Sequence, residues 1–436
     1  MLEKHNSSYR WLVLAATLFT YFLIVIQRTA PGLITDQLMH DFGVTASVVG
    51  VMASVQFLAY AGLQVPMGLL SDRFGPNAFL IAGTLLNGWG TVMYSLASHE
   101  AVLFLARMLV GIGDAAIWVN LVLILSRWFK AKEFIKLIGL AGVSGSLGFL
   151  AATAPLSAWI ALSGWRVPFF ATGAMLCLIG ILLYFVLVRG AAGRGLTAGK
   201  STSSKPFAGA GENREKTRTL LKRILSARQS WAMFLCHFGL VGTYIGFIGS
   251  WAVPYGMHMY GMTRSGASQI IMIGLIGALA GAPLSTWMAS RLGSMKRLYA
   301  AIHFMVFASW AAIFLCGGKP PFAVLVILFG LIGYGNGASA LTFGIVRDSF
   351  SIREVGIASG FANTGGFVSA ILLPSIFGKV LDHDQGSAAG VGYHDGFLIP
   401  VLFALLGLAG ALMMKETAPD SGELSEPAFG GGSSPL

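Results

Sequence analysis

Charged side chains are scarce in this sequence. Asp, Glu, Lys and Arg make up 11% of the residues, whereas ordinary soluble domains contain about 25%. Hydrophobic residues make up 55%, and the mean hydropathy is +0.74. So few charges exclude a soluble globular protein and predict a chain that is embedded in a lipid bilayer.

Cysteine is also rare, and the motifs of common enzymes are missing. The three cysteines, Cys177, Cys236 and Cys316, fall in three separate apolar segments, which argues against a disulfide framework and against metal-ligand spacing. No segment pairs a nucleophile with a base or presents a phosphate-binding loop. We therefore expect neither an enzyme nor a metal protein.

Long apolar runs fill most of the chain. A membrane-spanning helix needs about 20 mostly apolar residues. Twelve segments meet this requirement, and the first lacks a signal-peptide cleavage site, so we expect it to be retained. The expected spans are 11–34, 46–70, 77–97, 101–126, 135–160, 167–188, 231–255, 267–289, 297–316, 321–345, 354–379 and 394–414. The fold class predicted is an all-α integral membrane protein.

The positive charge is unevenly distributed over the expected loops. The formal net charge is +11, but the alternate loops that would face outward hold only four of the 29 Lys and Arg residues: Arg166, Arg264, Lys319 and Lys379. This bias predicts that both termini are cytoplasmic. It assigns the basic residues to membrane topology and not to a nucleic-acid partner. Short outer loops favour a bacterial inner (cytoplasmic) membrane.

The spans fall into two groups of six. Residues 1–188 and 231–414 form the expected halves; a polar, basic linker at 189–230 separates them, and 415–436 is expected to be a disordered cytoplasmic tail. Within the linker, 215–228 could form an amphipathic helix on the inner leaflet. Gly111 and Gly113 match Gly333 and Gly335 at a shift of 222 residues, and other pairs match at 218, which favours an internal duplication.

Three charges lie inside otherwise apolar spans: Arg28, Arg107 and Asp114. Each costs about 2.5–3.5 kcal/mol at membrane depth, so such residues usually face a protein-lined cavity. Arg28 is permanently charged and offers a fork of donors to an anion. Asp114 could bind and release a proton. Arg107 lies seven residues before it, on the same helix face but about 10.5 Å away along the axis, too far for direct pairing. A static buried pair that holds two helices together is the structural alternative.

The loop after the second span reads Gly68-Leu-Leu-Ser-Asp72-Arg73-Phe-Gly75 and resembles the signature loop of the major facilitator superfamily. The resemblance extends over essentially the whole chain. It implies twelve transmembrane helices in two pseudo-symmetric six-helix halves. It also implies that Gly68, Asp72, Arg73 and Gly75 form a latch between the halves in the outward-facing state. The basic residues usual after the last glycine are missing, since Pro76 follows.

Arg28 together with Arg107 and Asp114 resembles the anion–cation symporter branch of this superfamily, which includes carriers of sugar acids and other organic anions. Many members of this branch have an aspartate directly before the first arginine, where this chain has Gln27. Several also have an arginine in the seventh span, where this chain offers His237 and Tyr244. Asp114 is thus the sole obvious intramembrane carboxyl group.

Polar and aromatic residues near these charges are candidates for substrate contact. Gln56, Tyr60 and Gln64 form one stripe along the second span, and a polar stripe in lipid must face protein or water. Asn336 and Asn363 could bind substrate hydroxyls from the other half, and Trp251 could close over the substrate together with Tyr255. His237 is a further candidate for proton coupling. Taken singly, each of these residues could instead serve interhelical packing.

We therefore expect a proton-coupled symporter of a small organic anion, such as a carboxylate, which works as a monomer by rocker-switch alternating access. It would need no cofactor, because the proton gradient supplies the energy. One alternative is a drug/proton antiporter, although Gly145-Ser-Leu-Gly148 lacks the Gly-Pro signature of that group and Arg28 would be uncompensated in a pocket for cations. The other is a transport-dead metabolite sensor that signals through the basic segment 214–228.

Overall fold

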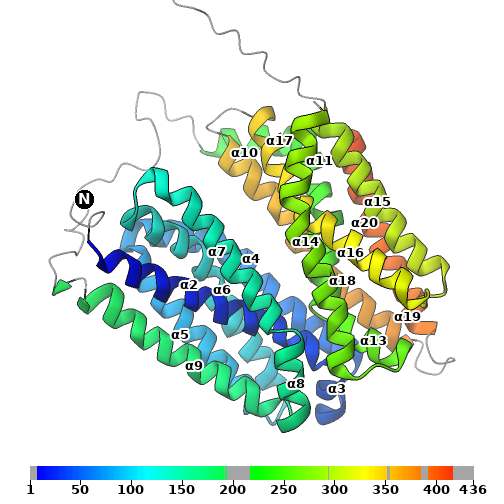
Figure 1. Cartoon of the computed structure of the whole chain (residues 1–436), viewed down its shortest axis with the longest axis horizontal. Helices are drawn as coiled ribbons and strands as arrows, with labels where there is room; N and C mark the ends of the chain where they lie inside the picture. Colours follow the sequence, from blue (N-terminus) through cyan, green and yellow to red (C-terminus); the bar gives the residue numbers. More distant parts are fainter. Residues whose placement is uncertain are drawn as a thin grey trace, which may run out of the picture.

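The computed structural model describes residues 7–190, 192–193, 217–292, 294–350, 354–383 and 391–415. Throughout these ranges the regular elements are helices, arranged as two bundles side by side (Figure 1). Blue to green helices form the N-terminal bundle, and green to red helices form the C-terminal bundle. This confirms the predicted all-α membrane fold.

The N-terminal half contains ten helical elements in its described part. They are α2 (Tyr9–Thr29), the 3-10 turn η1 (Ala30–Leu33), α3 (Thr35–Phe42), α4 (Ala46–Phe74), α5 (Pro76–Ser95), α6 (Glu100–Trp128), α7 (Ala131–Ala151), α8 (Ala154–Ser163), α9 (Arg166–Tyr184) and the π-helical segment η2 (Phe185–Gly190).

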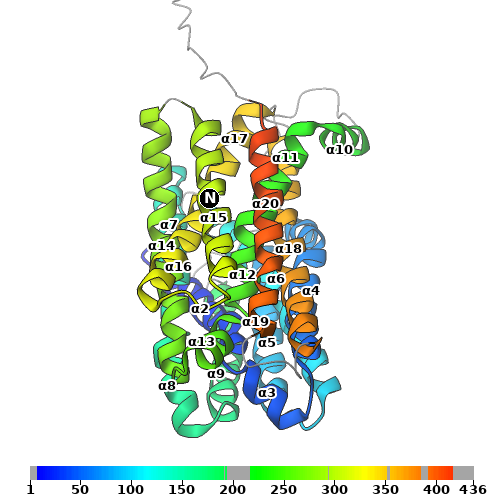
Figure 2. The same cartoon turned by 90° about the vertical axis from the view of Figure 1, so that its right-hand side faces the viewer.

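The second half follows the same plan. Its elements are α11 (Arg228–His237), the π-helical segment η3 (Phe238–Gly242), α12 (Thr243–Ile248), α13 (Ala252–Tyr260), α14 (Arg264–Leu292), α15 (Met295–Leu315), α16 (Phe322–Ala338), α17 (Leu341–Ser349), α18 (Val355–His383), α19 (Val391–Gly396) and α20 (Leu398–Met413). Before it, α10 (Thr217–Ser226) lies across the end of the bundle, where the linker was expected to form an amphipathic helix (Figure 2).

Eleven helical stretches in the described part are long and apolar enough to cross a membrane. The remaining expected span, 77–97, corresponds to α5, which has 20 residues and packs between α6 and α9. Its polar residues Thr84, Asn87 and Thr91 are buried there and bond to carbonyls of their own helix. These residues lower the hydropathy of α5 without exposing polar groups to lipid.

Several spans that were expected to be continuous are broken. The seventh changes from α-helical to π-helical geometry after His237 and is interrupted again at 249–251, before α13. The tenth is interrupted between Ala338 and Leu341. Hydropathy cannot predict such breaks because the residues on both sides stay apolar.

Two glycines that the sequence pairs by duplication occupy equivalent places. A Cβ atom on Gly111 of α6 would collide with the backbone of Gln56 in α4, and one on Gly333 of α16 would collide with the backbone of Gly274 in α14. Only glycine allows backbones to approach this closely. The matching contacts agree with two pseudo-symmetric halves.

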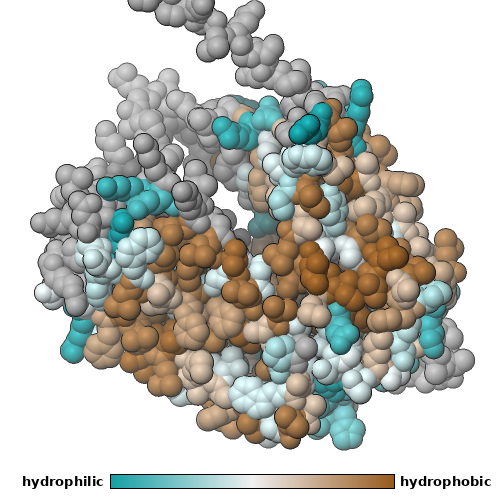
Figure 3. All heavy atoms as spheres, in the orientation of Figure 1, coloured by the Kyte–Doolittle hydropathy of each residue, from teal (hydrophilic) through white to brown (hydrophobic). Residues whose placement is uncertain are grey.

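The two halves touch at one end of the molecule, here called the gate side, and diverge at the end that carries α10, here called the linker side (Figure 1). At the gate side, Arg264 of α14 donates to both carboxylate oxygens of Asp36 in α3, at 2.7 and 2.5 Å. Asp382 of α18 accepts hydrogen bonds from the Ala46 and Ser47 backbone N–H groups at the start of α4, both at 2.8 Å. The space-filling view shows the hollow between the halves on the linker side (Figure 3). The molecule is therefore closed at the gate side and open at the linker side.

Candidate functional site

A cavity of about 510 Å³ lies between the two halves. Both halves line it, the N-terminal half through α2, α4, α6 and α7 and the C-terminal half through the segments from η3 to α12 and through α17 and α18. The lining residues are Tyr21, Arg28, Thr29, Phe57, Tyr60, Asp114, Trp118 and Phe149 on one wall, and Val241, Tyr244, Ile245, Ile248, Gly249, Phe343, Ser359, Gly360, Asn363, Gly366, Phe367 and Ala370 on the other. Such a position, between two halves that can move, suits a substrate site.

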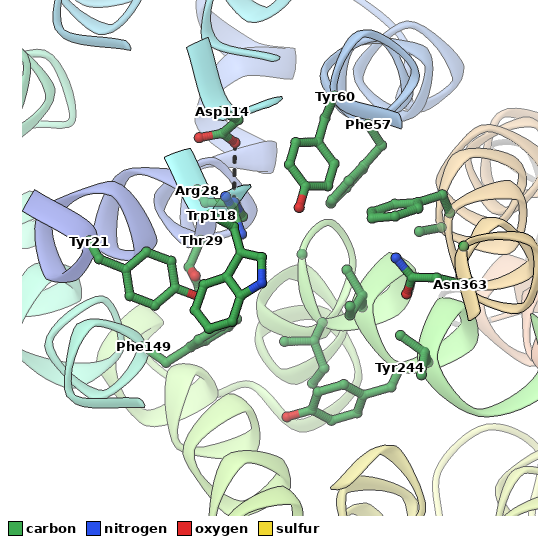
Figure 4. A pocket seen from close by; sticks show the side chains of 18 of the residues that line it. Tyr21, Arg28, Thr29, Phe57, Tyr60, Asp114, Trp118, Phe149, Tyr244 and Asn363 are labelled. Carbon is green, nitrogen blue, oxygen red and sulfur yellow. Dashed lines mark hydrogen bonds and ion pairs between the residues drawn. The ribbon is translucent and has the colours of Figure 1, made fainter. Parts of the chain in front are cut away.

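An ion pair forms the polar centre of the cavity. Arg28 Nε of α2 donates to Asp114 Oδ2 of α6 at 3.1 Å (Figure 4). The same oxygen accepts a second hydrogen bond, at 2.9 Å, from Gln56 Nε2 of α4. Three helices of the N-terminal half thus converge on one carboxylate, and Gln56 holds it from behind the cavity wall.

The pair leaves hydrogen-bonding capacity unused. Within the described chain, Arg28 Nη2 and Asp114 Oδ1 are both buried and have no hydrogen-bond partner. The Arg28 side chain is 22% exposed, whereas that of Asp114 is 2% exposed. The guanidinium carbon also lies 5.3 Å from the centre of the Tyr60 ring, within range of a cation–π contact. An anion in the cavity could therefore bind the exposed part of the Arg28 guanidinium, and a small shift of the side chain would make Nη2 available as a further donor.

The pairing changes one argument from the sequence. Arg28 was expected to be uncompensated, which spoke against a pocket for cationic drugs. The structure instead places Asp114 in contact with Arg28, so the formal charge of the pair is zero. The charge of Arg28 alone thus does not exclude cations from the cavity.

Five of the residues singled out from the sequence line the cavity: Arg28, Tyr60, Asp114, Tyr244 and Asn363. Figure 4 shows Asn363 pointing into the cavity from α18, opposite the pair. Gln56 does not line the cavity and reaches it only through its bond to Asp114.

Four other candidates lie elsewhere. Arg107 borders a separate space of about 10 Å³ on the gate side, with its guanidinium carbon 5.7 Å from the centre of the Tyr94 ring. Trp251 is 1% exposed and donates to the Pro374 carbonyl in the core of the C-terminal half. Asn336 and His237 are also absent from the cavity lining.

Each of these placements has a local cause. Arg107 is two helical turns from Asp114, so the two side chains reach different levels of the bundle. The interruption at 249–251 leaves Trp251 stacked on Phe377, and its partner candidate Tyr255 is likewise buried and bonded to the Gly318 carbonyl.

Asn336 and His237 are placed by their helices. Asn336 lies near the end of α16, whose glycine-rich face packs against α14. His237 faces the interior of its own half, where its Nδ1 atom lies 3.0 Å from Thr342 Oγ1.

The expected latch is described only in part. Gly75 joins α4 to α5 with φ of +94°, a conformation that L residues with a side chain rarely adopt. The tight turn predicted there is confirmed. The side chains of Gln64, Asp72 and Arg73, and the surroundings of Gly68, lie outside the described part of the structure.

The sequence reasoning missed most of the aromatic lining. Trp118 lies one helical turn after Asp114, and Tyr21 lies two turns before Arg28, so both share a helix face with a charge that was recognised. Phe57 similarly lies three residues before Tyr60. Helical spacing from Asp114, Arg28 and Tyr60 could have identified these residues. Aromatic residues are common in membrane spans, however, so their presence alone does not indicate a substrate site.

No group of three or more His, Cys, Asp or Glu side chains in the described ranges is placed to hold a metal ion. The residues that line the cavity offer an ion pair, hydrogen-bonding groups and aromatic rings.

Comparison with known proteins gives matches over nearly the full length. A family model described as Major Facilitator Superfamily matches residues 17–374. A probable galactarate/D-glucarate transporter of Escherichia coli strain K12 is 24% identical over 97% of this chain and 98% of its own length. A D-galactonate transporter of E. coli O6:H1 is 22% identical over 93% and 95%, and a probable sulfoacetate transporter of Cupriavidus necator is 22% identical over 89% and 93%.

A solved structure shares the fold. It is a bacterial homologue of the human lysosomal transporter Spinster, in an inward-facing and unoccupied conformation, and it superposes with a TM-score of 0.70 at 16% identity. The alignment covers 94% of this chain and 96% of that one.

Proposed function

The chain belongs to the major facilitator superfamily, whose members are transporters, and we propose that it carries a small organic anion in symport with protons. The proposed location is the cytoplasmic membrane, with both termini and the linker side in the cytoplasm. We propose a functional monomer, because the cavity lies between the two halves of a single chain. The proton gradient would be the sole energy source, without a cofactor.

The observation that carries the proposal is Arg28, a cation that faces a cavity between two halves. Arginine stays charged at any pH that a membrane protein meets, and its planar fork suits carboxylate and sulfonate groups. Relatives are named as transporters, two of them as probable transporters, of galactarate or D-glucarate, D-galactonate and sulfoacetate, which are all organic anions. The part of the Arg28 guanidinium that is exposed to the cavity is the proposed docking point for the anionic group.

Asp114 is the proposed proton carrier. While Asp114 is ionised, it occupies Arg28 Nε and neutralises the guanidinium. Protonation removes that charge, so Arg28 can bind the substrate anion with full strength. The cavity then holds one cation, one substrate anion and a neutral carboxylic acid, and its formal charge is again zero. Substrate and proton are thereby favoured together, because either alone would leave a net charge in an apolar site.

Movement of the halves would complete the cycle. The open linker side and the closed gate side correspond to an inward-facing state. The outward-facing state requires the pairs at the gate side to separate, and a ligand can favour that change only if it binds the two states with different affinity.

Two variants of the purified protein in proteoliposomes test the proposal. The probes are D-galactonate and benzenesulfonate, an anion that stays ionised and does not cross lipid unaided. With an inwardly directed proton gradient, we expect uphill uptake of at least one probe. Asp114→Asn should lose uphill uptake but keep exchange, whereas Arg28→Lys should weaken uptake at least tenfold, because the fork is lost.

Two matched substitutions serve as controls. Asp348→Asn and Arg347→Lys change exposed residues at the end of α17, outside the cavity, and should leave uptake unchanged. Uphill uptake by Asp114→Asn would exclude Asp114 as the coupling group. Normal uptake by Arg28→Lys would remove Arg28 from the substrate site.

A further inference from the structure

The walls of the cavity are more informative about the substrate than its polar centre. Relatives are named for galactarate, D-glucarate and D-galactonate, which carry several hydroxyl groups. A cavity built for such molecules should present many hydrogen-bonding side chains. The lining of this cavity is instead dominated by aromatic and aliphatic residues.

The charges of the lining limit the substrate to one anionic group. Arg28 and Asp114 are the only charged residues that line the cavity within the described chain. Arg107, the other intramembrane cation, borders the small separate space on the gate side. A second carboxylate, as in galactarate, would find no cation to pair with and would be desolvated without compensation.

The wall opposite the pair presents few side chains that can form hydrogen bonds with hydroxyl groups of a substrate. Apart from Tyr244, its large side chains are apolar, namely Val241, Ile245, Ile248, Phe343 and Phe367, and its small polar side chains are Ser359 and Asn363. Tyr244 also lines this wall, but its hydroxyl lies against Gly274 of α14, close enough that a Cβ atom there would be 3.0 Å away.

The wall around the pair is largely aromatic, and its polar side-chain atoms other than those of the pair and Thr29 are the Tyr21 and Tyr60 hydroxyls and the Trp118 indole N–H. Phe57, Tyr60, Trp118 and Phe149 surround Arg28 and Asp114 (Figure 4). Tyr60 also meets Phe367 of the other half, with ring centres 5.0 Å apart. Thr29 Oγ1 already donates to the Val25 carbonyl at 3.0 Å, so its proton is not available to a ligand.

From these observations we infer that the substrate is a singly charged carboxylate or sulfonate with an apolar ring, and not a polyhydroxylated sugar acid. The inference rests on the proposed function, because the anionic head is assigned to Arg28. The ring lies against Val241, Ile245 and Ile248, between the aromatic side chains of both halves. Asn363 can bond to a single polar substituent. A sugar acid bound at Arg28 would place hydroxyl groups against the aliphatic side chains of Val241, Ile245 and Ile248, where they find no partner, and this disfavours its binding.

Isothermal titration of the purified full-length protein in detergent tests the inference. The ligands are phenylacetate, benzenesulfonate, D-galactonate and galactarate, with tetraphenylphosphonium as the cation. We expect the two ring monoanions to bind at least tenfold more tightly than either sugar acid. If D-galactonate or galactarate binds as tightly as the ring monoanions, the inference fails but the proposed function stands. If only tetraphenylphosphonium binds, both fail.

A near-isosteric substitution tests the wall itself. Val241→Thr replaces a methyl group with a hydroxyl group at the cavity surface and should weaken binding of the ring monoanions by about three- to tenfold. Val324→Thr makes the same change at a site on α16 that is 41% exposed and outside the cavity lining, and should have no effect. Equal affinity in wild type and Val241→Thr would overturn the placement of the ring.

Discussion

Arg28 and Asp114 are 86 positions apart in the sequence and meet in one ion pair. The sequence predicts that both are functional, since each is a charge inside an apolar span. It does not predict that they pair, because pairing depends on how α2 is rotated against α6. That rotation is set by contacts such as the Tyr21 ring against Gly145 of α7, where a Cβ atom would lie 2.8 Å from the ring.

Gln56 is a second residue whose polar role the sequence predicts but whose contacts it does not. Its place in a polar stripe with Tyr60 predicts contact with protein or water, and both residues do make polar or cavity contacts. The spacing of the stripe does not indicate which of its residues faces the substrate. Only the tertiary arrangement shows that Tyr60 lines the cavity while Gln56 supports Asp114 from behind.

A second acid, Asp41 on the gate side, provides a test at the residue scale. The pKa of Asp41 is lowered from its ordinary value of 3.8, chiefly by the hydrogen bond from Trp165 Nε1 at 2.8 Å. The bond therefore stabilises the fold fully above that ordinary value and ceases to do so only as the pH falls through the lowered pKa. Across the range in which a transporter is assayed, Asp41 stays ionised.

We expect Asp41→Ala to reduce stability by about 1 kcal/mol, because Trp165 loses its partner. The decrease in melting temperature, measured by thermal unfolding in detergent, should be the same at pH 5 and at pH 8. Both proteins carry His40→Gln, because His40 Nδ1 lies 3.3 Å from Asp41 Oδ1 and an imidazole could add its own pH dependence. In that background, a difference between the two that changes across this interval would show that Asp41 titrates in it, contrary to the lowered pKa.

At the scale of helices, the number and order of the spans follow from hydropathy, but their breaks do not. The interruption at 249–251 directs Trp251 into the core of the C-terminal half, although a continuous helix had suggested a place at the substrate. Buried π-helical turns such as η3 depend on packing between helices, which a hydropathy window does not contain.

The contact between α18 and α4 gives a prediction at the same scale. Asp382 accepts two backbone hydrogen bonds at the start of α4, where the helix dipole also favours a negative charge. Asp382→Asn should weaken the closed gate by about 1 kcal/mol and raise the population of gate-open molecules roughly fivefold.

Spin labels at the exposed residues His40 and Lys319, one on each half, would report this population by pulsed electron resonance. Asp395→Asn is the matched control, because Asp395 is exposed on α19 and pairs with the adjacent His394. An unchanged distance distribution in Asp382→Asn would rule out a role for this contact in holding the gate.

At the scale of the whole molecule, duplication and the two-half architecture could be predicted from paired glycines and loop motifs. The conformation could not be predicted, because under the proposed alternating access the same sequence also adopts the opposite state. Contacts at the gate side, such as Arg264 with Asp36, select the state that is seen. These contacts join residues that are far apart in the sequence, and nothing in the sequence indicates that they are close in space.

The charge balance of the cavity gives a prediction for the complete transport cycle. The empty site contains the Arg28–Asp114 pair, and the loaded site would contain Arg28, a monoanion and protonated Asp114, so both carry the same formal charge. Uptake of benzenesulfonate driven by a pH gradient should therefore be the same in proteoliposomes clamped at 0 and at −100 mV. If one net charge moved per cycle, 100 mV would contribute about 2.3 kcal/mol, and accumulation would differ by a factor on the order of 50. A difference of that size would require a second titrating group. Uptake by His237→Gln would then show whether His237 is that group.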